Sequence, residues 1–331
     1  MTILVTGCAG FIGFHLARVL LERGERVVGF DNLNAYYDPA LKAARLAILE
    51  QQPGFAFVRG DLADQAAVLA LAEMHPAIDR IVHLGAQAGV RYAERDPFAY
   101  AEANLKGQVT VLELARRLPR LSHVLYASSS SVYGGNGKVP FAETDAVERP
   151  LNLYAASKRG AELIAQAYAH LHGLPCTGLR FFTVYGPWGR PDMAYFSFAE
   201  AIAAGRPITV YADGVLKRDF TWIEDIVAGL IGALDAGPAV AARPEEPGGA
   251  PHRLYNLGNH RAEPVERLVS LLERALGRAA IRETAPKPRA DAPETFADIR
   301  RAAEDFGFAP TTTLEEGIPR FVAWFRAWKG L

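Results

Sequence analysis

Short apolar runs alternate with amphipathic stretches over roughly the first 180 residues of the chain. Runs such as ILV and IVHL are apolar at consecutive positions, which is typical of strands buried on both faces of a parallel sheet. Between these runs the apolar residues recur at helical spacing. We expect strands at 2–6, 26–31, 55–59, 78–84, 123–128 and 176–181, and helices at 11–23, 40–52, 65–74, 98–117 and 151–172.

The pattern changes after position 181. The stretch RFFTVYGPWGRPDMAYF is rich in Gly, Pro and aromatic residues, which indicates an ordered loop rather than a linker. The later periodicity predicts helices at 196–204, 223–234, 263–276 and 314–328, strands at 208–211 and 254–257, and a surface loop at 237–251.

Strands that alternate with helices pair in parallel through right-handed crossovers. The sequence therefore predicts an α/β fold, a doubly wound parallel sheet (Rossmann) with a smaller C-terminal α/β substrate lobe. A chain of 331 residues is long enough for both parts. We expect a first domain at 1–181 that is rejoined by about 219–257, and a lobe formed by 182–218 and 258–331.

Three glycines, Gly7, Gly10 and Gly13, follow the first expected strand and begin the first expected helix. In a dinucleotide site they allow a tight turn, a close approach of the pyrophosphate, and close packing of helix on strand. Asp31 ends the second expected strand, where a carboxylate binds the adenosine ribose and repels a 2′-phosphate. The pattern predicts NAD as the cofactor. The alternative is a glycine-rich turn that packs without a ligand.

Two residues after the third expected strand, Asp61 and Leu62, are further candidates for contact with the dinucleotide. A side chain at this position can reach the adenine edge. Asp61 as a plain helix N-cap is the alternative interpretation.

Tyr154 and Lys158 have the spacing that places two side chains on one face of a helix, one turn apart. Tyrosine is a poor base at its usual pKa near 10. A neighbouring ammonium and the positive nicotinamide ring would lower that pKa, so that the phenolate removes a proton from a sugar hydroxyl. Tyr and Lys at this spacing are also common on helix surfaces. Here the pair follows a dinucleotide pattern, which favours the catalytic interpretation.

A run of four serines at 128–131 ends the fifth expected strand. Strand C-termini in open parallel sheets face the ligand crevice, so these hydroxyls are candidates for binding a polar substrate. Ser129 is the residue that we expect to share a proton with Tyr154. A solvated turn at the end of the strand is the alternative.

Composition and charge exclude several classes of function. The 36 basic and 37 acidic side chains nearly cancel, which gives no electrostatic reason to expect nucleic acid as a partner. No apolar run is long enough to insert into a membrane. Two isolated cysteines, Cys8 and Cys176, and eight histidines without ligand spacing predict no metal site. With no basic leader, the chain is expected in the cytoplasm.

Six segments together resemble a known family. They are DNLNAYYDPALKAARL (31–46), HLGAQAGVRYAERDPFAY (83–100), YASSSSVYG (126–134), LYAASK (153–158), GLRFFTVYGPWGRPDMA (178–194) and RDFTWIEDIV (218–227). With the glycines and the Tyr/Lys pair, the chain resembles the extended short-chain dehydrogenase/reductase family of nucleotide-sugar epimerases and dehydratases over nearly its whole length. YYD and TVYGPWGRPDMA are the most specific of these pieces.

The resemblance implies roles for individual residues. Tyr154 would be the catalytic base, with Lys158 beside it and Ser129 as the third member of the triad. The positions that would line NAD are Gly7, Gly10, Phe11, Ile12, Gly13, Asp31, Asn32, Lys42, Asp61, Leu62, Gln87, Asn104, Tyr154 and Lys158. The resemblance further implies a homodimer formed through the helices expected at 98–117 and 151–172, and a place in polysaccharide biosynthesis.

The resemblance also implies a UDP-sugar as substrate, and in particular inversion of C4 of UDP-glucuronate to give UDP-galacturonate. Oxidation at C4 turns a uronate into a β-keto acid, so hydroxyls and a guanidinium must hold its carboxylate against loss of carbon dioxide. The candidate substrate ligands are Ser129, Ser130, Ser131, Thr183, Arg190, Val210, Tyr211, Arg218, Arg289 and Asp291. At 287–291 KPRAD stands where the family has a Pro-Gly-Asp-like element.

Three alternatives to this activity stay open at the level of sequence. The chain could epimerise neutral UDP-hexoses, decarboxylate UDP-glucuronate to a pentose, or serve as a non-catalytic NAD-binding scaffold or sensor. Arg91 is a second cation near the expected crevice, and it could contact the substrate or close a loop.

Overall fold

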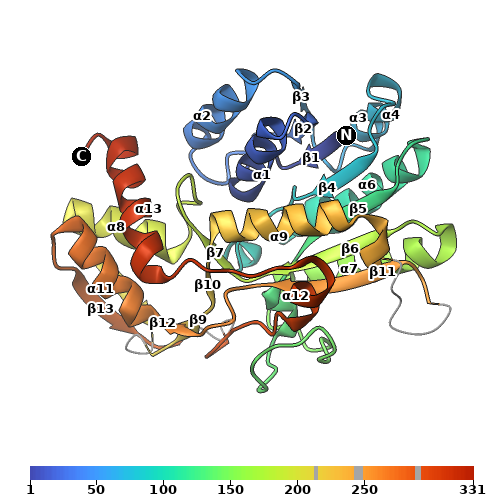
Figure 1. The fold of residues 1–331 in the computed structure, drawn as a ribbon. Coiled ribbons are helices and arrows are strands. Elements are labelled where there is room, and N and C mark those ends of the chain that lie inside the picture. Colours follow the sequence, from blue (N-terminus) through green and yellow to red (C-terminus); the bar gives the residue numbers. More distant parts are fainter. Residues whose placement is uncertain (212–214, 242–248, 288–291) are drawn as a thin grey trace.

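The computed structural model describes residues 1–211, 215–241, 249–287 and 292–331. Its main feature is a seven-stranded parallel sheet in the order β11-β6-β5-β4-β1-β2-β3 (Figure 1). The fold is therefore the doubly wound, Rossmann-like sheet that the sequence predicts. The strands are β1 (Thr2–Thr6), β2 (Arg26–Asp31), β3 (Phe55–Arg59), β4 (Arg80–His83), β5 (His123–Ser129), β6 (Cys176–Phe181) and β11 (His252–Leu257).

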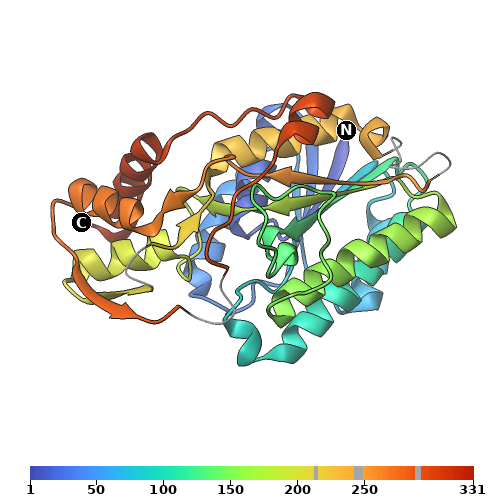
Figure 2. The ribbon, with the colours of Figure 1, turned by 90° about the horizontal axis from the view of Figure 1, so that it is seen from below.

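Helices cover both faces of the sheet, which Figure 2 shows nearly edge-on. One face carries α1 (Phe11–Glu22), α2 (Pro39–Glu50), α9 (Ile223–Ala236) and α12 (Arg300–Phe306). The other face carries α3 (Gln65–Leu69), α4 (Leu71–Met74), α6 (Gly107–Arg117) and α7 (Leu153–His172).

The consecutive apolar residues of the strands divide between these two layers. In β1, Ile3 and Val5 pack into the core beneath α1 and α9, whereas Leu4 packs into the core beneath α6 and α7. Successive side chains of a strand point to opposite faces, so a strand covered on both faces must be apolar at every position. The ILV run follows from this double burial.

A second, smaller group of elements lies beside the C-terminal edge of the sheet and includes the C-terminus (Figure 1). The strand β8 pairs in parallel with β13, and α8, α11 and α13 pack around them. The bounds are α8 (Ala194–Ala204), β8 (Pro207–Tyr211), β9 (Lys217–Arg218), β12 (Glu263–Pro264), α11 (Val265–Leu276), β13 (Ile281–Ala285) and α13 (Leu314–Lys329). Two short strands, β7 (Thr183–Tyr185) and β10 (Phe220–Trp222), pair between the two groups.

The expected elements are mostly present, but three of them are organised differently from the expectation. The helix expected at 98–117 is divided into α5 (Pro97–Tyr100), a π-helical turn (Ala101–Lys106) and α6. The helix expected at 65–74 is divided at Ala70 into α3 and α4. The loop expected at 237–251 begins with a short helix, α10 (Pro238–Ala241), and 242–248 lie outside the described residues.

Several short elements were not expected from the sequence, among them β7, β9, β10, β12, β13 and α12. The strand β13 is exposed along most of its length, so it carries no apolar signal, and α12 has only seven residues. No described helix is long and apolar enough to cross a lipid bilayer. The boundaries between the two expected domains stay a prediction, although β11 does return to the edge of the main sheet beside β6.

Candidate active site

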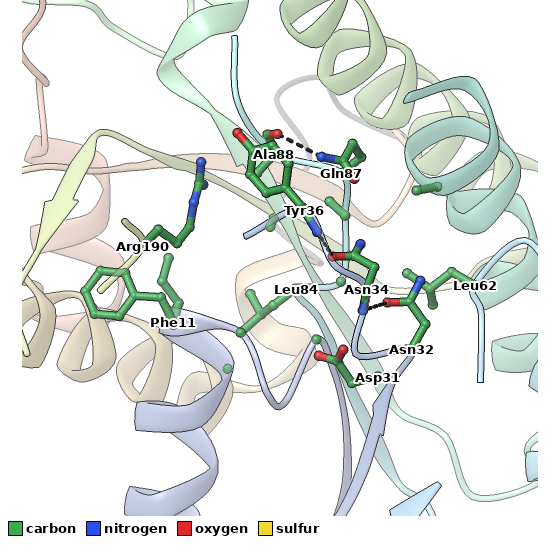
Figure 3. A pocket seen from close by; sticks show the side chains of 18 of the residues that line it. Phe11, Asp31, Asn32, Asn34, Tyr36, Leu62, Leu84, Gln87, Ala88 and Arg190 are labelled. Carbon is green, nitrogen blue, oxygen red and sulfur yellow. Dashed lines mark hydrogen bonds between the residues drawn. The ribbon is translucent and has the colours of Figure 1, made fainter. Parts of the chain in front are cut away.

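A pocket opens at the C-terminal ends of β1, β2, β4 and β5, where parallel sheets of this kind bind ligands (Figure 3). It brings together residues that are far apart in the sequence. Among its lining residues are Gly7, Gly10, Phe11, Ile12, Gly13, Asp31, Asn32, Lys42, Asp61, Leu62, Gln87, Ser129, Tyr154, Lys158 and Arg190. These are thirteen of the fourteen expected cofactor residues, together with Ser129 and Arg190.

The glycine turn has no room for side chains. Gly7 has φ +70°, and a Cβ on Gly10 or Gly13 would lie 2.9 or 2.2 Å from the Gly7 carbonyl oxygen. The amides in the first turn of a helix have no acceptor within that helix. At the start of α1 no side chain caps them either. This is the cradle that a pyrophosphate requires.

Asp31 is fixed at the end of β2 by two backbone amides. Its Oδ2 accepts from Ala9 N at 3.1 Å and its Oδ1 accepts from Leu33 N at 2.8 Å. The carboxylate is thereby joined to the glycine turn. A carboxylate in this place fits the ribose hydroxyls of NAD and repels the extra phosphate of NADP.

The segment after Asp31 forms one wall of the pocket, and its two asparagines hydrogen-bond neighbouring groups (Figure 3). Asn32 Nδ2 donates to Asp61 Oδ2 at 2.8 Å, and Lys42 Nζ donates to Asn34 Oδ1 at 2.7 Å. Asp61 is not the N-cap of α3, because Asp64 accepts from the first turn of that helix. The N-cap interpretation of Asp61 is therefore wrong, and Asp61 faces the pocket.

Asn104 does not line the pocket. It is 3% exposed, and its Nδ2 donates to the Gln87 carbonyl at 3.0 Å and to Ser157 Oγ at 2.9 Å. Ser157 Oγ in turn donates to the Tyr154 carbonyl at 2.8 Å. Asn104 therefore connects the Gln87 loop, which lines the pocket, to the helix that carries Tyr154.

The three candidate catalytic residues meet in the pocket from two elements. Ser129 ends β5, whereas Tyr154 and Lys158 lie one turn apart on α7. The helix begins at Asn152, whose side chain accepts from Ala155 N at 2.8 Å, so Tyr154 is in its first turn. Lys158 Nζ donates to the Ala127 carbonyl at 2.9 Å, which secures it against β5.

The electrostatics of Tyr154 differ from the expectation. Burial raises the pKa of Tyr154, and this outweighs the lowering by the Ser129 hydrogen bond and the Arg190 charge, while Asp192 raises it further. Burial also lowers the pKa of Lys158 to about 8. The cation of this chain that acts on Tyr154 is therefore Arg190 rather than Lys158, and a positively charged nicotinamide would add to it.

The serine run is held from behind by a buried ion pair. Ser128 Oγ donates to Glu162 Oε1 at 2.6 Å, and Arg180 donates to both oxygens of Glu162 at 2.8 and 2.9 Å. All three side chains are buried. The pair fixes the end of β5, and so the position of Ser129.

Arg190 extends into the pocket from the loop between β7 and α8 and is held by an acidic neighbour. Its Nε and Nη2 donate to the two oxygens of Asp192 at 3.0 and 2.5 Å. Tyr36 donates to Asp192 Oδ2 at 3.0 Å from the opposite wall. In Figure 3 the guanidinium of Arg190 points toward the same end of the pocket as the Tyr36 ring.

Comparison with known proteins decides the family. The family model described as NAD dependent epimerase/dehydratase matches residues 3–258. The chain belongs to this family. It is 46% identical to UDP-glucuronate 4-epimerase 1 of Arabidopsis thaliana, over 100% of this chain and 78% of that protein. It is also 46% identical to a probable UDP-glucuronate 4-epimerase of Rhizobium meliloti (strain 1021), over 98% and 97%.

A solved structure supports the same conclusion. UDP-glucuronic acid 4-epimerase from Bacillus cereus, in complex with UDP-glucuronic acid and NAD, has a TM-score of 0.88 and 30% identity. The match covers 99% of this chain and 100% of that one. The resemblance to nucleotide-sugar epimerases and dehydratases is thus confirmed.

Apart from Ser129 and Arg190, the residues expected to bind the substrate are not among the described residues that line the pocket. Ser131 contacts a lining residue, since Ser129 Oγ donates to Ser131 Oγ at 3.2 Å. Ser130 and Thr183 are half-buried nearby, whereas Val210 packs into the core. Arg289 and Asp291 lie outside the described residues.

Tyr211 and Arg218 belong to the smaller group of elements, on β8 and β9. Arg91 stacks over the Tyr211 ring, 4.6 Å from its centre, and donates to its hydroxyl at 3.2 Å. This contact joins the loop after β4 to the smaller group. It favours the loop-closing interpretation of Arg91.

Sequence reasoning missed several residues, of which Tyr36 lines the pocket while Asp192 and Arg45 lie outside its lining. Tyr36, Asp192 and Arg45 were inside the segments that carry the family resemblance, but no role was assigned to them. The sequence RPD was a possible signal, because a carboxylate two positions from an arginine can pair with it. The contacts of Tyr36 and Arg45 join segments distant in sequence, so no local pattern indicates them.

Proposed function

We propose that this protein inverts C4 of UDP-glucuronate to give UDP-galacturonate, with NAD bound throughout. The observation that carries the proposal is the position of Arg190 in the same pocket as Tyr154 and Ser129. A guanidinium beside the proton-transfer group is what a sugar with a carboxylate next to its reacting carbon requires. A neutral hexose has no carboxylate for this guanidinium to bind, whereas a uronate has one beside C4.

The residues of the pocket fit NAD. The glycine turn has no side chain in the way and would hold the pyrophosphate, and the Asp31 carboxylate would accept hydrogen bonds from the ribose hydroxyls. When bound, NAD supplies the chemistry of taking a hydride from C4 and returning it to the opposite face.

Proton transfer belongs to Tyr154. As the phenolate, Tyr154 would take the proton of the C4 hydroxyl when C4 is oxidised, and the resulting phenol would return that proton when C4 is reduced. Ser129 hydrogen-bonds to Tyr154 and favours its ionised form. Lys158, fixed on Ala127, lies one turn along the same helix face and can hold the nicotinamide ribose.

Retention of the carboxylate belongs to Arg190. The 4-keto uronate loses carbon dioxide when its carboxylate is poorly solvated and free to align with the carbonyl. A carboxylate that accepts hydrogen bonds from a guanidinium is stabilised as the anion, which opposes loss of carbon dioxide. Arg190 provides this contact on the side of the pocket that Tyr154 occupies.

The decisive experiment is NMR of the products after incubation of the purified protein with UDP-glucuronate and no added NAD. We expect UDP-galacturonate. A UDP-pentose would identify a decarboxylase, and turnover of UDP-glucose in preference would identify a neutral hexose epimerase. No conversion of any nucleotide sugar, even with NAD added, would exclude catalysis and leave a binding role.

We infer that the protein is a homodimer. On α5, α6 and α7 several apolar side chains are exposed, with Phe98 at 79%, Leu171 at 69% and Leu163 at 53%. The helices α6 and α7 lie side by side, joined by Tyr168 Oη, which donates to Glu113 at 2.8 Å (Figure 2). Exposed apolar residues on adjacent helices favour burial against a second copy.

The expected location and pathway are further proposals. Both cysteines are free and buried, which is compatible with a reducing compartment such as the cytoplasm. The product, an activated acidic sugar, would then be available to enzymes that build polysaccharides. Cell fractionation with an antibody against the protein tests the location.

A further inference from the structure

The ion pair between Arg190 and Asp192 has an unusual position relative to the pocket. Arg190 lines the pocket, whereas Asp192 does not. Asp192 occupies the Nε and Nη2 edge of the guanidinium with both carboxylate oxygens, as a bidentate partner. A substrate carboxylate therefore meets a guanidinium whose charge is already compensated by this chain.

Asp192 is held in place from two sides. Besides Arg190, the hydroxyl of Tyr36 donates to its Oδ2, and Tyr36 packs against Tyr92 with ring centres 4.8 Å apart. Arg190 and Tyr36 together lower the pKa of Asp192, so the carboxylate stays ionised and competent to pair. The Asp192 carboxylate therefore stays paired with the Arg190 guanidinium, and a substrate carboxylate has to compete with it.

Inversion at C4 gives this competition a consequence. A cofactor held in this pocket would present one face to the sugar in both half-reactions, so the sugar would have to present first one face of C4 and then the other. The carboxylate sits on C5, next to C4, and must move when the ring turns. A full bidentate ion pair with Arg190 in a partly buried pocket would hold the ring and slow this movement.

We propose that Asp192 is a positioning residue that competes with the substrate carboxylate for Arg190, so that the sugar is held loosely enough to turn. The proposal rests on the proposed function, because it requires a uronate substrate. Binding that is equally strong before and during the reaction does not raise kcat. Asp192 thus exchanges affinity for turnover.

The test is Asp192→Asn, which keeps the shape of the side chain and removes its charge. Binding is measured by calorimetry on the NAD-loaded protein in a Tyr154→Phe background, so that turnover does not interfere. We expect UDP-glucuronate to bind about tenfold more tightly, or ~1.4 kcal/mol. With Tyr154 present, we expect kcat to fall by about tenfold. The affinity for UDP-glucose should stay within about twofold, since it has no carboxylate.

A matched control is Asp38→Asn. Asp38 caps α2, is exposed and does not line the pocket, and Asn caps a helix equally well. The control also removes one negative charge, but from an exposed position outside the pocket lining. It should change neither the affinity for UDP-glucuronate nor kcat by more than about twofold. Asp192 also raises the pKa of Tyr154. The values of kcat are therefore compared in a pH range in which the kcat of each protein does not change with pH.

Three results would overturn the proposal: no tightening of UDP-glucuronate, equal tightening of UDP-glucose, or tightening with an unchanged kcat. A simple loss of structure would weaken the binding of both ligands together, and so also counts against it. The unmodified protein separates this outcome from failure of the proposed function. If it converts UDP-glucuronate but Asp192→Asn shows no opposite changes in affinity and kcat, only the role of Asp192 is wrong.

Discussion

Arg45 on α2 donates to the carbonyl oxygen of Ala9, in the glycine turn, at 2.8 Å. The same guanidinium also donates to the carbonyls of Trp188 and Gly189, the residues just before Arg190. Arg45 is 0% exposed. One side chain therefore fixes the cofactor side of the pocket to the loop that carries the substrate cation.

Replacing Arg45 by Met should destabilise the protein and distort the site. Two buried carbonyl groups and one partly buried carbonyl group would lose their donor, and each costs on the order of 1 kcal/mol or more when left unpaired. We expect the free energy of unfolding to fall by roughly 3 kcal/mol in urea titrations. A loss below about 1 kcal/mol would contradict this account. Arg18→Met, an exposed change on α1, is the control.

Tyr154→Phe should abolish turnover without abolishing binding. Removing the group that transfers the proton is expected to lower kcat by roughly a thousandfold, while the affinity for UDP-glucuronate changes little. Tyr168→Phe removes the same hydroxyl group from the outer part of α7, where it donates to Glu113, and should leave kcat intact. If the two variants lose activity alike, Tyr154 is not the base.

Lys158→Met should lower activity but not stability. Burial lowers the pKa of Lys158 from 10.5 to about 8, so at pH 7 its charge is present at a cost to the folded state. We expect kcat to fall by roughly 100-fold while the midpoint of urea unfolding at pH 7 is unchanged or higher.

The lowered pKa of Lys158 makes the free energy of unfolding depend on pH. Between about pH 8 and 10.5 the unfolded chain binds more protons at Lys158 than the folded one, so the unmodified protein gains stability as the pH rises through this window. Lys158→Met should gain less stability there. Equal gains in the two proteins would mean that Lys158 is not the group concerned.

His123 should contribute to acid instability. It is buried at the start of β5 with Nε2 on Thr177, and burial lowers its pKa from 6.5 to about 3. Below pH 6.5 the unfolded chain binds a proton there that the folded chain does not, so stability falls with pH. For His123→Gln this fall should be smaller by about 1.4 kcal/mol per pH unit near pH 5, measured by urea unfolding. The exposed His170→Gln should behave like the unmodified protein.

Leu163→Arg should produce a monomer if the exposed face of α6 and α7 is the subunit interface. A charge buried without a partner between two copies would cost several kcal/mol. Light scattering at micromolar concentration should give twice the chain mass for the unmodified protein and one chain mass for the variant. A monomeric unmodified protein would exclude the proposed dimer.

Much of the cofactor side could be predicted because it is local in sequence. Gly7, Gly10 and Gly13 lie within one turn and helix, and Asp31 is placed by the strand that it ends. Helical spacing places Tyr154 and Lys158 on one face of a helix, and the preceding dinucleotide pattern favours a catalytic role for them. For such residues the backbone geometry of a few consecutive positions decides where the side chain goes.

The substrate side was less predictable because its contacts join distant segments. Asp192 meets Tyr36 across 156 positions of sequence. The pKa of Tyr154 depends on its burial, on Ser129, and on the charges of Arg190 and Asp192. Asn104 fits the family pattern for a cofactor residue, yet its buried amide holds Gln87 and Ser157 instead. Burial and pairing of this kind follow from tertiary packing.

The strand β11 completes the sheet from a late part of the chain, next to β6. During synthesis on the ribosome, β6 emerges well before residues 252–257 and has no neighbour on its outer side until they arrive. An unpaired strand edge readily pairs with strands of other chains. A nascent or truncated polypeptide that stops before β11 would expose the edge of β6 and would tend to aggregate. Fragments ending near residue 250 should accumulate as aggregates, whatever the integrity of the nucleotide pocket they contain.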